Sequence, residues 1–554
     1  MYKIRSLGGT LRVSTRGFST FSTLSIGRHP IPCIPNKASL VFNSATLNQK
    51  SHFSMSPTTR SQSSPKPSIS HPPSTSPNEE SSLHAQSHPQ KPTIAIIGTG
   101  WAGWTLTQEL SATTSCTSPY NIIAISPSRT MALTPLLASA ACSIFDFRIA
   151  EEPVRRRDSK FEKYQALVTS VDFDNQIIKC KACIGGSGVS GESMDSATYK
   201  DIKKDEAEFD VKYDKLILAP GCETNTFGTP GVKEHALFMK TVPDARRLRE
   251  GILDCLERAS LPTVSEQEKR NMLHFAIVGG GPTGIELAAE IDELIQEHLG
   301  AVYPRLKDLC TISIYDVADR LLGQFGEKLS EYAMGKFENR GCVNVKTGKH
   351  IEEIKRHSMV IKEEGEVPFG VVVWAVGNTA GKLVEGLKCR KSEGLQRILT
   401  DKWLRVLAPD SNGVDGKGAD IIENVYALGD AADISNNELP TTAEVAVQKA
   451  KWLTQHLFDS APTCHPVNEA SEARLANLKN PPNNTPFQYR QKDLIAYIGR
   501  GDGVIQGKTD WTGASAWLAW RSGSIAWTRG WRRRVMVVVN WVANWVDGRE
   551  VARR

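Results

Sequence analysis

The fold is decided by Thr93-Ile-Ala-Ile-Ile97-Gly98-Thr-Gly100-Trp-Ala-Gly103, a short apolar run followed by three spaced glycines. The pattern recurs later in His274-Phe-Ala-Ile-Val278-Gly279-Gly-Gly281-Pro-Thr-Gly284. Each apolar run predicts a buried strand, and residues 104–110 and 285–294 predict the helices that follow. The glycines permit a tight turn that brings backbone N–H groups and a helix N-terminus close to a pyrophosphate. Two copies therefore predict two dinucleotide-binding sites.

The residue that ends the next strand of each unit predicts how the ribose is held. After the second motif, Thr311-Ile-Ser-Ile-Tyr315 ends in Asp316, whose carboxylate could accept hydrogen bonds from both ribose hydroxyls of an adenosine. A 2′-phosphate would meet that negative charge, so the second site should prefer NADH to NADPH, although Arg320 lies nearby. The strand after the first motif ends in Ser126, so the first site must hold its ribose differently.

Three further apolar segments stand in the chain order of a flavoprotein with two dinucleotide sites. Tyr213-Asp-Lys-Leu-Ile-Leu-Ala-Pro-Gly221 reads as a buried strand that runs into a turn. Asn424-Val-Tyr-Ala-Leu-Gly429-Asp430 delivers a carboxylate that could bond a ribityl hydroxyl, and Val371-Val-Val-Trp374-Ala-Val-Gly377 plays the matching role near a nicotinamide. Each alone is usually a core strand. Their order predicts an α/β fold of two Rossmann-like domains.

The chain's charge is concentrated at its ends. It has 554 residues and a net charge of +6, but residues 1–78 hold nine Lys and Arg and no acid. The body is acidic, which removes the main support for a nucleic-acid partner. The Arg- and Ser-rich residues 1–30 predict a mitochondrial transit peptide, and the Ser/Pro-rich residues 31–91 predict a disordered linker. Eleven scattered cysteines suit reduced thiols inside a cell.

The C-terminal residues 511–554 hold seven of the twelve tryptophans beside the arginines Arg529, Arg532, Arg533 and Arg534. Trp and Arg together favour a membrane interface. Within residues 535–546, Asn540 and Asn544 share one helical face, while Val537, Val538, Trp541 and Trp545 crowd the other. Such a helix is expected to lie in the lipid surface without crossing it. The alternative is that these tryptophans pack a C-terminal lobe or a dimer interface.

Residues 92–554 resemble the type II (alternative) NADH:quinone oxidoreductases, especially the fungal mitochondrial members. The resemblance rests on Gly98 to Gly103, Ser126-Pro127 followed by Leu133-Thr134-Pro135-Leu136-Leu137, Gly279 to Glu290, Gly429-Asp430, Leu439-Pro440-Thr-Thr-Ala443-Glu444-Val-Ala-Val-Gln448, and a C-terminal tail. It implies non-covalent FAD at the first site, NADH as substrate at the second, and ubiquinone entering from the membrane side. Reduction of the quinone would then proceed without proton pumping.

The resemblance also implies catalytic residues. Glu286 matches a family carboxylate near the nicotinamide, and Gln448 matches one of two glutamines beside the flavin and quinone. This sequence departs from the family at Glu444, where relatives usually carry Gln. We expect Glu444 and Gln448 to share a helical face, with Glu444 partly desolvated and able to give a proton to the quinone. An outward-turned Glu444 is the alternative.

These observations together predict an NADH-binding domain inserted into an FAD-binding domain, with a C-terminal membrane-contacting region. The expected boundaries are 1–30 transit peptide, 31–91 linker, 92–240 FAD domain first part, 241–384 NADH domain, 385–460 FAD domain second part and 461–554 membrane-anchoring region. We expect a peripheral protein of the mitochondrial inner membrane on the matrix side. The sequence does not decide whether the protein forms a homodimer.

Two other functions remain as alternatives. A disulfide or sulfide reductase needs a cysteine pair against the flavin, and Cys180-Lys-Ala-Cys183 has the spacing without the expected placement. The other alternative is an FAD- and NADH-binding redox sensor or death-effector flavoprotein with little quinone turnover. We expect no metal site, because a single CxxC is weak for zinc and Asp410-Ser-Asn-Gly-Val-Asp415 has the wrong order for a calcium loop.

Overall fold

The computed structural model describes residues 91–112, 118–157, 159–184, 207–409, 420–460 and 485–550. The expected transit peptide 1–30, nearly all of the expected linker 31–91 and the loop 410–415 lie outside the described residues. All elements below belong to the compact unit Gln86–Arg554.

The first glycine motif sits in an eight-stranded sheet with the order β22-β19-β20-β21-β9-β1-β2-β5. Its central strands run parallel, as β1 pairs with both β2 and β9, and β9 pairs with β21. The eight strands are β1 (Thr93–Ile97), β2 (Asn121–Ile125), β5 (Glu162–Tyr164), β9 (Lys215–Leu218), β19 (Ile398–Thr400), β20 (Arg405–Leu407), β21 (Ile421–Ala427) and β22 (Ala432–Ile434). Strands from both sides of the second motif therefore share one sheet.

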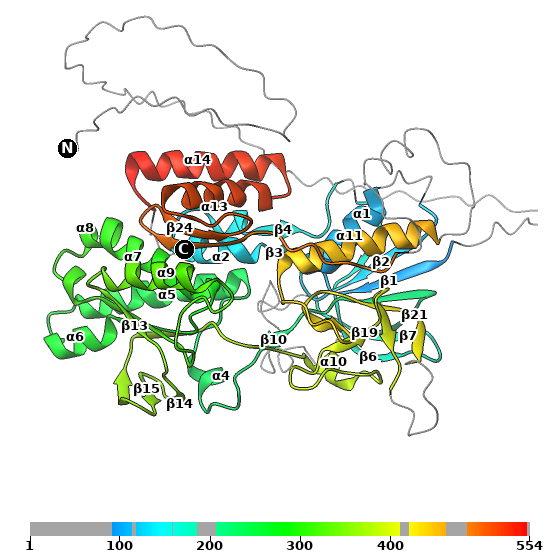
Figure 1. Cartoon of the computed structure of the whole chain (residues 1–554), viewed down its shortest axis with the longest axis horizontal. Helices are drawn as coiled ribbons and strands as arrows, with labels where there is room; N and C mark the ends of the chain where they lie inside the picture. The colour runs from blue at the N-terminus through cyan, green and yellow to red at the C-terminus, as the bar shows by residue number, and fades with distance from the viewer. Residues whose placement is uncertain are drawn as a thin grey trace, which may run out of the picture. The chain divides into compact units, whose positions relative to one another are not determined.

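Side chains of β1 alternate between two cores, as a strand buried on both faces requires. Ile94 and Ile96 pack under α1 (Trp101–Ala112) and α11 (Ala443–Asp459). Ala95 and Ile97 face the opposite core. That side is covered by a three-stranded sheet, β6 (Ala166–Asp172), β7 (Ile177–Ala182) and β8 (Glu208–Lys212), and by α10 (Lys382–Gly386). Figure 1 shows α1 and α11 lying together over the eight-stranded sheet.

The second glycine motif sits in a four-stranded, fully parallel sheet with the order β13-β12-β11-β17. These strands are β11 (His274–Val278), β12 (Thr311–Tyr315), β13 (Val343–Lys346) and β17 (Val371–Trp374). One face packs on α5 (Val242–Ala259), α7 (Pro282–Glu293) and α9 (Glu327–Glu338). The other face packs on the antiparallel strands β14 (Ile351–Ile354), β15 (Ser358–Ile361) and β16 (Gly365–Pro368). The expected pair of Rossmann-like α/β domains is confirmed.

Short elements link these layers. They are β3 (Thr130–Ala132) paired with β4 (Glu151–Pro153), β10 (Glu223–Thr224) paired with β18 (Asn378–Thr379), α2 (Leu137–Ala141), α4 (Val232–His235), α6 (Glu266–Met272), α8 (Gly300–Val302), and the turn helices at Thr134–Leu136, Phe147–Ile149, Leu294–Leu299, Lys307–Leu309 and Gly429–Ala431. Strand β10 follows β9 of the first sheet, and β18 follows β17 of the second sheet. Their pairing therefore links the two crossings between the domains.

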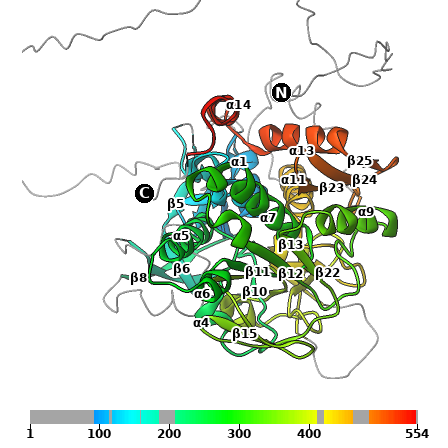
Figure 2. The same ribbon diagram turned by 90° about the vertical axis from the view of Figure 1, so that its left-hand side faces the viewer.

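The C-terminal part begins with β23 (Leu494–Gly499), β24 (Asp502–Gln506) and β25 (Trp511–Thr512) and continues into α13 (Ala514–Trp527) and α14 (Trp531–Asp547). Strand β23 packs on α7, and α13 lies along β24, as Figure 2 shows. Trp520 of α13 and Val537 of α14 join the same core as α2, α5 and α7. None of the helices in the described part of the chain combines the length and apolar character that crossing a bilayer requires.

Helix α14 has the expected Asn face and apolar face, except that Val537, expected on the apolar face, is buried on the side of Asn544. The side chain of Asn544 faces the protein and donates to the carbonyl of Ile144 at 2.7 Å, and Val537 is buried. The amide turns inward because the carbonyl groups behind α2 need a donor. The outward face is apolar, with Trp531 and Trp545 78% and 86% exposed beside Val535, Met536, Val538, Val539, Val542 and Val546.

The arginine cluster is only partly a surface feature, which corrects the expectation that all four arginines serve the membrane. Glu152 of β4 is fully buried, and its carboxylate accepts from the backbone N–H of Arg529 and the guanidinium of Arg533, both at 3.0 Å. The Arg529 guanidinium lies over the rings of Trp101 and Trp104. A buried carboxylate needs such partners, so these two arginines hold α13 and α14 on the first domain. Arg532 and Arg534 remain exposed.

Candidate functional site

The first glycine turn is shaped by close backbone packing. Gly98 has φ +95°, and a Cβ there would lie 2.0 Å from the carbonyl oxygen of Ala219. A Cβ on Gly103 would lie 2.0 Å from the Gly98 oxygen, whereas Gly100 faces open space. Only glycine tolerates these contacts, so the turn brings the start of α1 close to whatever fills that space.

The second turn repeats this arrangement. Gly279 has φ +120°, Gly284 packs on the Gly279 oxygen, and Gly281 faces open space before α7. Asp316, which follows β12, accepts from the backbone N–H of Gly280 at 2.5 Å and from that of Ala318 at 2.8 Å. The structure thus brings the expected ribose-binding carboxylate next to the second glycine turn.

Both turns open into one cavity of about 960 Å³. Among the expected site residues, it is lined by Gly98, Gly100, Gly281, Gly377, Gly429 and Asp430. The expected residue Pro135 lies in the turn Thr134–Leu136, whose Thr134 lines the cavity and accepts from Trp101 Nε1 at 3.1 Å. The cavity also reaches Pro282 and Thr283, so it runs from the first domain to the start of α7.

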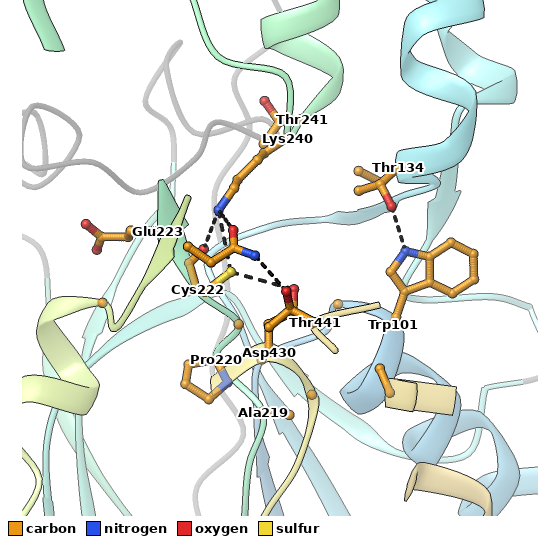
Figure 3. Close-up of a pocket in the computed structure, with 18 of the residues that line it drawn as sticks. Trp101, Thr134, Ala219, Pro220, Cys222, Glu223, Lys240, Thr241, Asp430 and Thr441 are labelled. Atoms are coloured by element: carbon orange, nitrogen blue, oxygen red, sulfur yellow. Dashed lines mark hydrogen bonds between the residues drawn. The ribbon is translucent and has the colours of Figure 1, made fainter. Parts of the chain in front are cut away.

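A lysine that sequence reasoning missed reaches into this cavity. Lys240 directly precedes the capping box of α5, and its Nζ donates to Asn378 Oδ1 at 2.9 Å and approaches Cys222 Sγ at 3.5 Å. Cys222 Sγ lies 3.6 Å from Asp430 Oδ2, and Asn378 donates to Thr441 at 2.9 Å. Figure 3 shows Lys240 extending toward Cys222, with Asp430 and Thr441 close by. Burial raises the pKa of Cys222 to about 11.

Lys240 carries no recognisable motif, because its role depends on residues far away in the sequence. The only local signal is its place before Thr241, whose side chain accepts from the backbone N–H of Asp244 and starts α5. That signal marks a helix start and says nothing of a lysine in a cavity.

Glu286 lies on α7 one helical turn beyond the cavity-lining Thr283. Its carboxylate accepts from the indole N–H of Trp520 at 3.0 Å and from the backbone N–H of Tyr497 at 3.4 Å. Burial raises the pKa of Glu286 to about 8, against the lowering effect of these two donors. The C-terminal strand and helix thus reach the carboxylate that the sequence singled out.

Glu444 and Gln448 share one face of α11, and Gln448 Nε2 donates to Glu444 Oε1 at 2.7 Å. The Glu444 side chain is 33% exposed, and its carboxylate pairs with Lys492 at 2.8 Å. Gln448 also bonds both backbone groups of Arg490. Lys492 is 48 residues away in the sequence and close to Glu444 only in the fold, so the local sequence could not reveal this ion pair.

Cys180 lies within β7 and Cys183 directly follows that strand, and both are buried. Their thiols contact the carbonyl groups of Ile178 and Lys181. The cavity is instead lined by Cys222, so the CxxC pair does not occupy the position that a flavin-linked disulfide needs.

Comparison with known proteins finds relatives that match most of the chain. Residues 92–450 match the family described as pyridine nucleotide-disulphide oxidoreductase. The chain is 30% identical to the mitochondrial internal alternative NAD(P)H-ubiquinone oxidoreductase A1 of Arabidopsis thaliana, over 84% of this chain and 86% of the relative. It is 29% identical to the external alternative NAD(P)H-ubiquinone oxidoreductase B1 of Solanum tuberosum, over 84% and 91%.

A solved structure shares the fold. NDH2 from Plasmodium falciparum, determined in complex with NADH, superposes with a TM-score of 0.69 over 84% of this chain and all of that chain. The two sequences are 23% identical, so this likeness concerns the fold alone.

Proposed function

The chain belongs to the pyridine nucleotide-disulphide oxidoreductase family and, within it, to the alternative NAD(P)H-ubiquinone oxidoreductases, and we propose that it oxidises NADH and reduces ubiquinone without pumping protons. The observation that carries this proposal is the single cavity lined by both glycine turns. A cavity lined by both turns would let a bound flavin and a bound nicotinamide approach each other, which is what direct hydride transfer requires.

FAD fits the first turn. Gly100 leaves space beside the N-terminus of α1, which favours a pyrophosphate, and the Asp430 carboxylate lines the same cavity. When bound, FAD supplies the acceptor for the hydride and the donor for the two electrons. Hydrogen bonds from Lys240 to Asn378 and from Asn378 to Thr441 would fix this part of the cavity wall in one conformation.

NADH fits the second turn, where Gly281 leaves the corresponding space. Asp316 would accept from the ribose hydroxyls, and Gly377, which lines the cavity after β17, would lie near the nicotinamide. Glu286 would lie beyond it as a carboxylate that orients the reacting end of NADH.

The quinone site is proposed at the α11 side of the cavity. Ala443 and Ala446 of α11 line the cavity, and Glu444 and Gln448 stand on the same helix beside the segment of Arg490. Gln448 would contact the quinone directly, and Glu444 would fix the Gln448 amide through their hydrogen bond.

The apolar outer face of α14 supports a membrane contact. Trp531 and Trp545 share this face with six exposed aliphatic or methionine side chains, and Arg532 and Arg534 are exposed near its start. Indole rings and arginines beside an apolar strip favour the lipid interface. We therefore propose peripheral binding to the mitochondrial inner membrane through this face, on the matrix side, with the basic residues 1–30 as the import signal.

Detergent-purified protein tests the function. We expect acid precipitation to release free flavin, and NADH consumption to depend on a short-chain ubiquinone. NADH oxidation that is equally slow with and without the quinone would favour a sensor over an oxidoreductase.

A further inference from the structure

Trp520 is buried and connects the C-terminal helix α13 to the cavity side of α7. It is 2% exposed, and its only polar atom, Nε1, donates to Glu286 Oε1 at 3.0 Å. The two residues lie 234 positions apart in the sequence. The contact therefore exists only when the C-terminal part packs on the second domain.

The indole is held in place by its neighbours. Its ring stacks on the ring of Tyr497, with centroids 4.7 Å apart and planes 19° apart. The Tyr497 hydroxyl donates to Glu293, and the Tyr497 backbone N–H is the second donor to Glu286. A stacked and anchored ring has one orientation, so its N–H points at the carboxylate without a further entropic cost.

We propose that Trp520 is a positioning residue of the reaction centre, whose indole N–H holds the Glu286 carboxylate in the orientation and ionised form used at the nicotinamide end of NADH. This inference rests on the proposed NADH oxidation. It makes α13 part of the catalytic apparatus in addition to its place in the C-terminal region.

The charges around Glu286 come from several elements. Glu290, one turn further along α7, disfavours a second negative charge, and Arg549 and Arg521 partly offset Glu290. Ser139 of α2 donates to Glu290 at 2.8 Å, and Glu293 pairs with Arg549. Among these groups, the N–H of Trp520 and the N–H of Tyr497 are the contacts that favour ionised Glu286 directly.

Trp520→Phe removes the donor and keeps a stacked ring. The matched control is Trp511→Phe, whose Nε1 donates at the same 3.0 Å to the surface residue Thr509. In the full chain, the infrared band of the protonated Glu286 carboxyl, identified by its loss in Glu286→Gln, reports the ionisation. We expect its midpoint to rise by about one pH unit in Trp520→Phe and to stay in place in Trp511→Phe.

Stopped-flow reduction of the flavin by NADH gives the functional readout. We expect Trp520→Phe to be about five- to tenfold slower near pH 7.5 and to recover at alkaline pH, because fewer molecules carry the ionised carboxylate. Adding Trp520→Phe to Glu286→Gln should change the rate less than about twofold, since each change alone already removes the same Trp520–Glu286 interaction.

An unshifted infrared midpoint, superimposable pH profiles, or a further large loss in the double variant would overturn the inference. The double variant keeps it testable if Trp520→Phe lowers stability, since a structural defect would persist without Glu286. A wild-type flavin that NADH does not reduce would instead contradict the proposed function.

Discussion

The expected preference for NADH over NADPH rests on Asp316, whose carboxylate is fixed by hydrogen bonds. Two backbone N–H groups hold its carboxylate at the end of β12, beside the second glycine turn. A 2′-phosphate would have to approach that fixed charge. We therefore expect the preference for NADH to depend on this one residue.

Asp316→Asn should weaken the discrimination against NADPH while leaving an acceptor for the ribose. We expect the NADPH/NADH ratio of kcat/KM to rise about ten- to hundredfold, equivalent to about 1–3 kcal/mol. The control is Asp319→Asn, which removes an exposed carboxylate three residues away. Equal ratios in wild type and Asp316→Asn would mean that the ribose lies elsewhere.

Glu444→Gln tests the quinone side of the site. The Glu444–Lys492 pair is substantially exposed, so its loss should change the KM for ubiquinone by no more than about fivefold. Reduction of the flavin by NADH should not change. Stopped-flow reoxidation by quinone measures the effect, with Glu438→Gln, an exposed carboxylate six residues earlier, as the control. A collapse of flavin reduction by NADH would argue against this placement.

At the scale of elements, the sequence predicted the strands around both glycine turns because apolar runs and glycines are local signals. Strands β1, β11 and β12 begin and end where the apolar pattern predicted, and β2 ends directly before Ser126. The burial of Val537 and the partners of Asn544 on α14 were not predictable, because Asn544 donates to carbonyl groups about 400 residues earlier. Lys240 and the Lys492 partner of Glu444 were missed for the same reason.

Helix α14 gives the element-scale prediction. Replacing Val542 and Trp545 with Ser should release the protein from vesicles with anionic lipid, because both side chains are exposed on the apolar face. Flavin reduction by NADH should persist. Val302→Ser on α8, similarly exposed, is the control. Equal sedimentation of all three proteins with vesicles would rule out this face as the lipid contact.

Deleting residues 511–554 is a poorer test of the same idea. The deletion would also remove Trp520 and Arg549, whose partners are the carboxylates of α7. Any loss of membrane binding would then be mixed with damage to the second domain.

At the scale of the whole molecule, Arg549 ties the end of the described chain to its middle. Its guanidinium bonds Glu290 at 3.5 Å and Glu293 at 2.8 Å, and all three side chains are at most 7% exposed. It also donates to the Cys142 carbonyl. The C-terminal part is thus held by buried charges on both domains, together with the Glu152 contacts of Arg529 and Arg533.

Arg549→Met should lower the free energy of unfolding by about 3–5 kcal/mol near pH 8, because two buried carboxylates lose their cation. Arg270→Met, which breaks an exposed pair with Glu266, should cost less than about 1 kcal/mol. Urea denaturation followed by Trp fluorescence measures both. Equal midpoints for the two variants would show that the buried network does not hold the fold.

The pH dependence of stability follows from the same carboxyls. Burial raises the pKa of Glu290 from 4.5 to about 7 and that of Glu286 to about 8. The folded protein therefore keeps protons that the unfolded chain has released, and stability falls as pH rises from about 4.5 to about 8. We expect a lower urea midpoint near pH 8.5 than near pH 6, and a smaller difference in Glu286→Gln. A midpoint that does not change with pH would contradict the burial of these groups.

The central claim is that two dinucleotide sites share one cavity and pass electrons from NADH to ubiquinone. The most direct test is an anaerobic stopped-flow experiment on the purified full chain, in which NADH is mixed first and a short-chain ubiquinone second. We predict that NADH bleaches the flavin absorption within a turnover time and that the quinone restores it. A flavin that is bleached by NADH but not restored by ubiquinone, or that NADH does not bleach, would contradict the account.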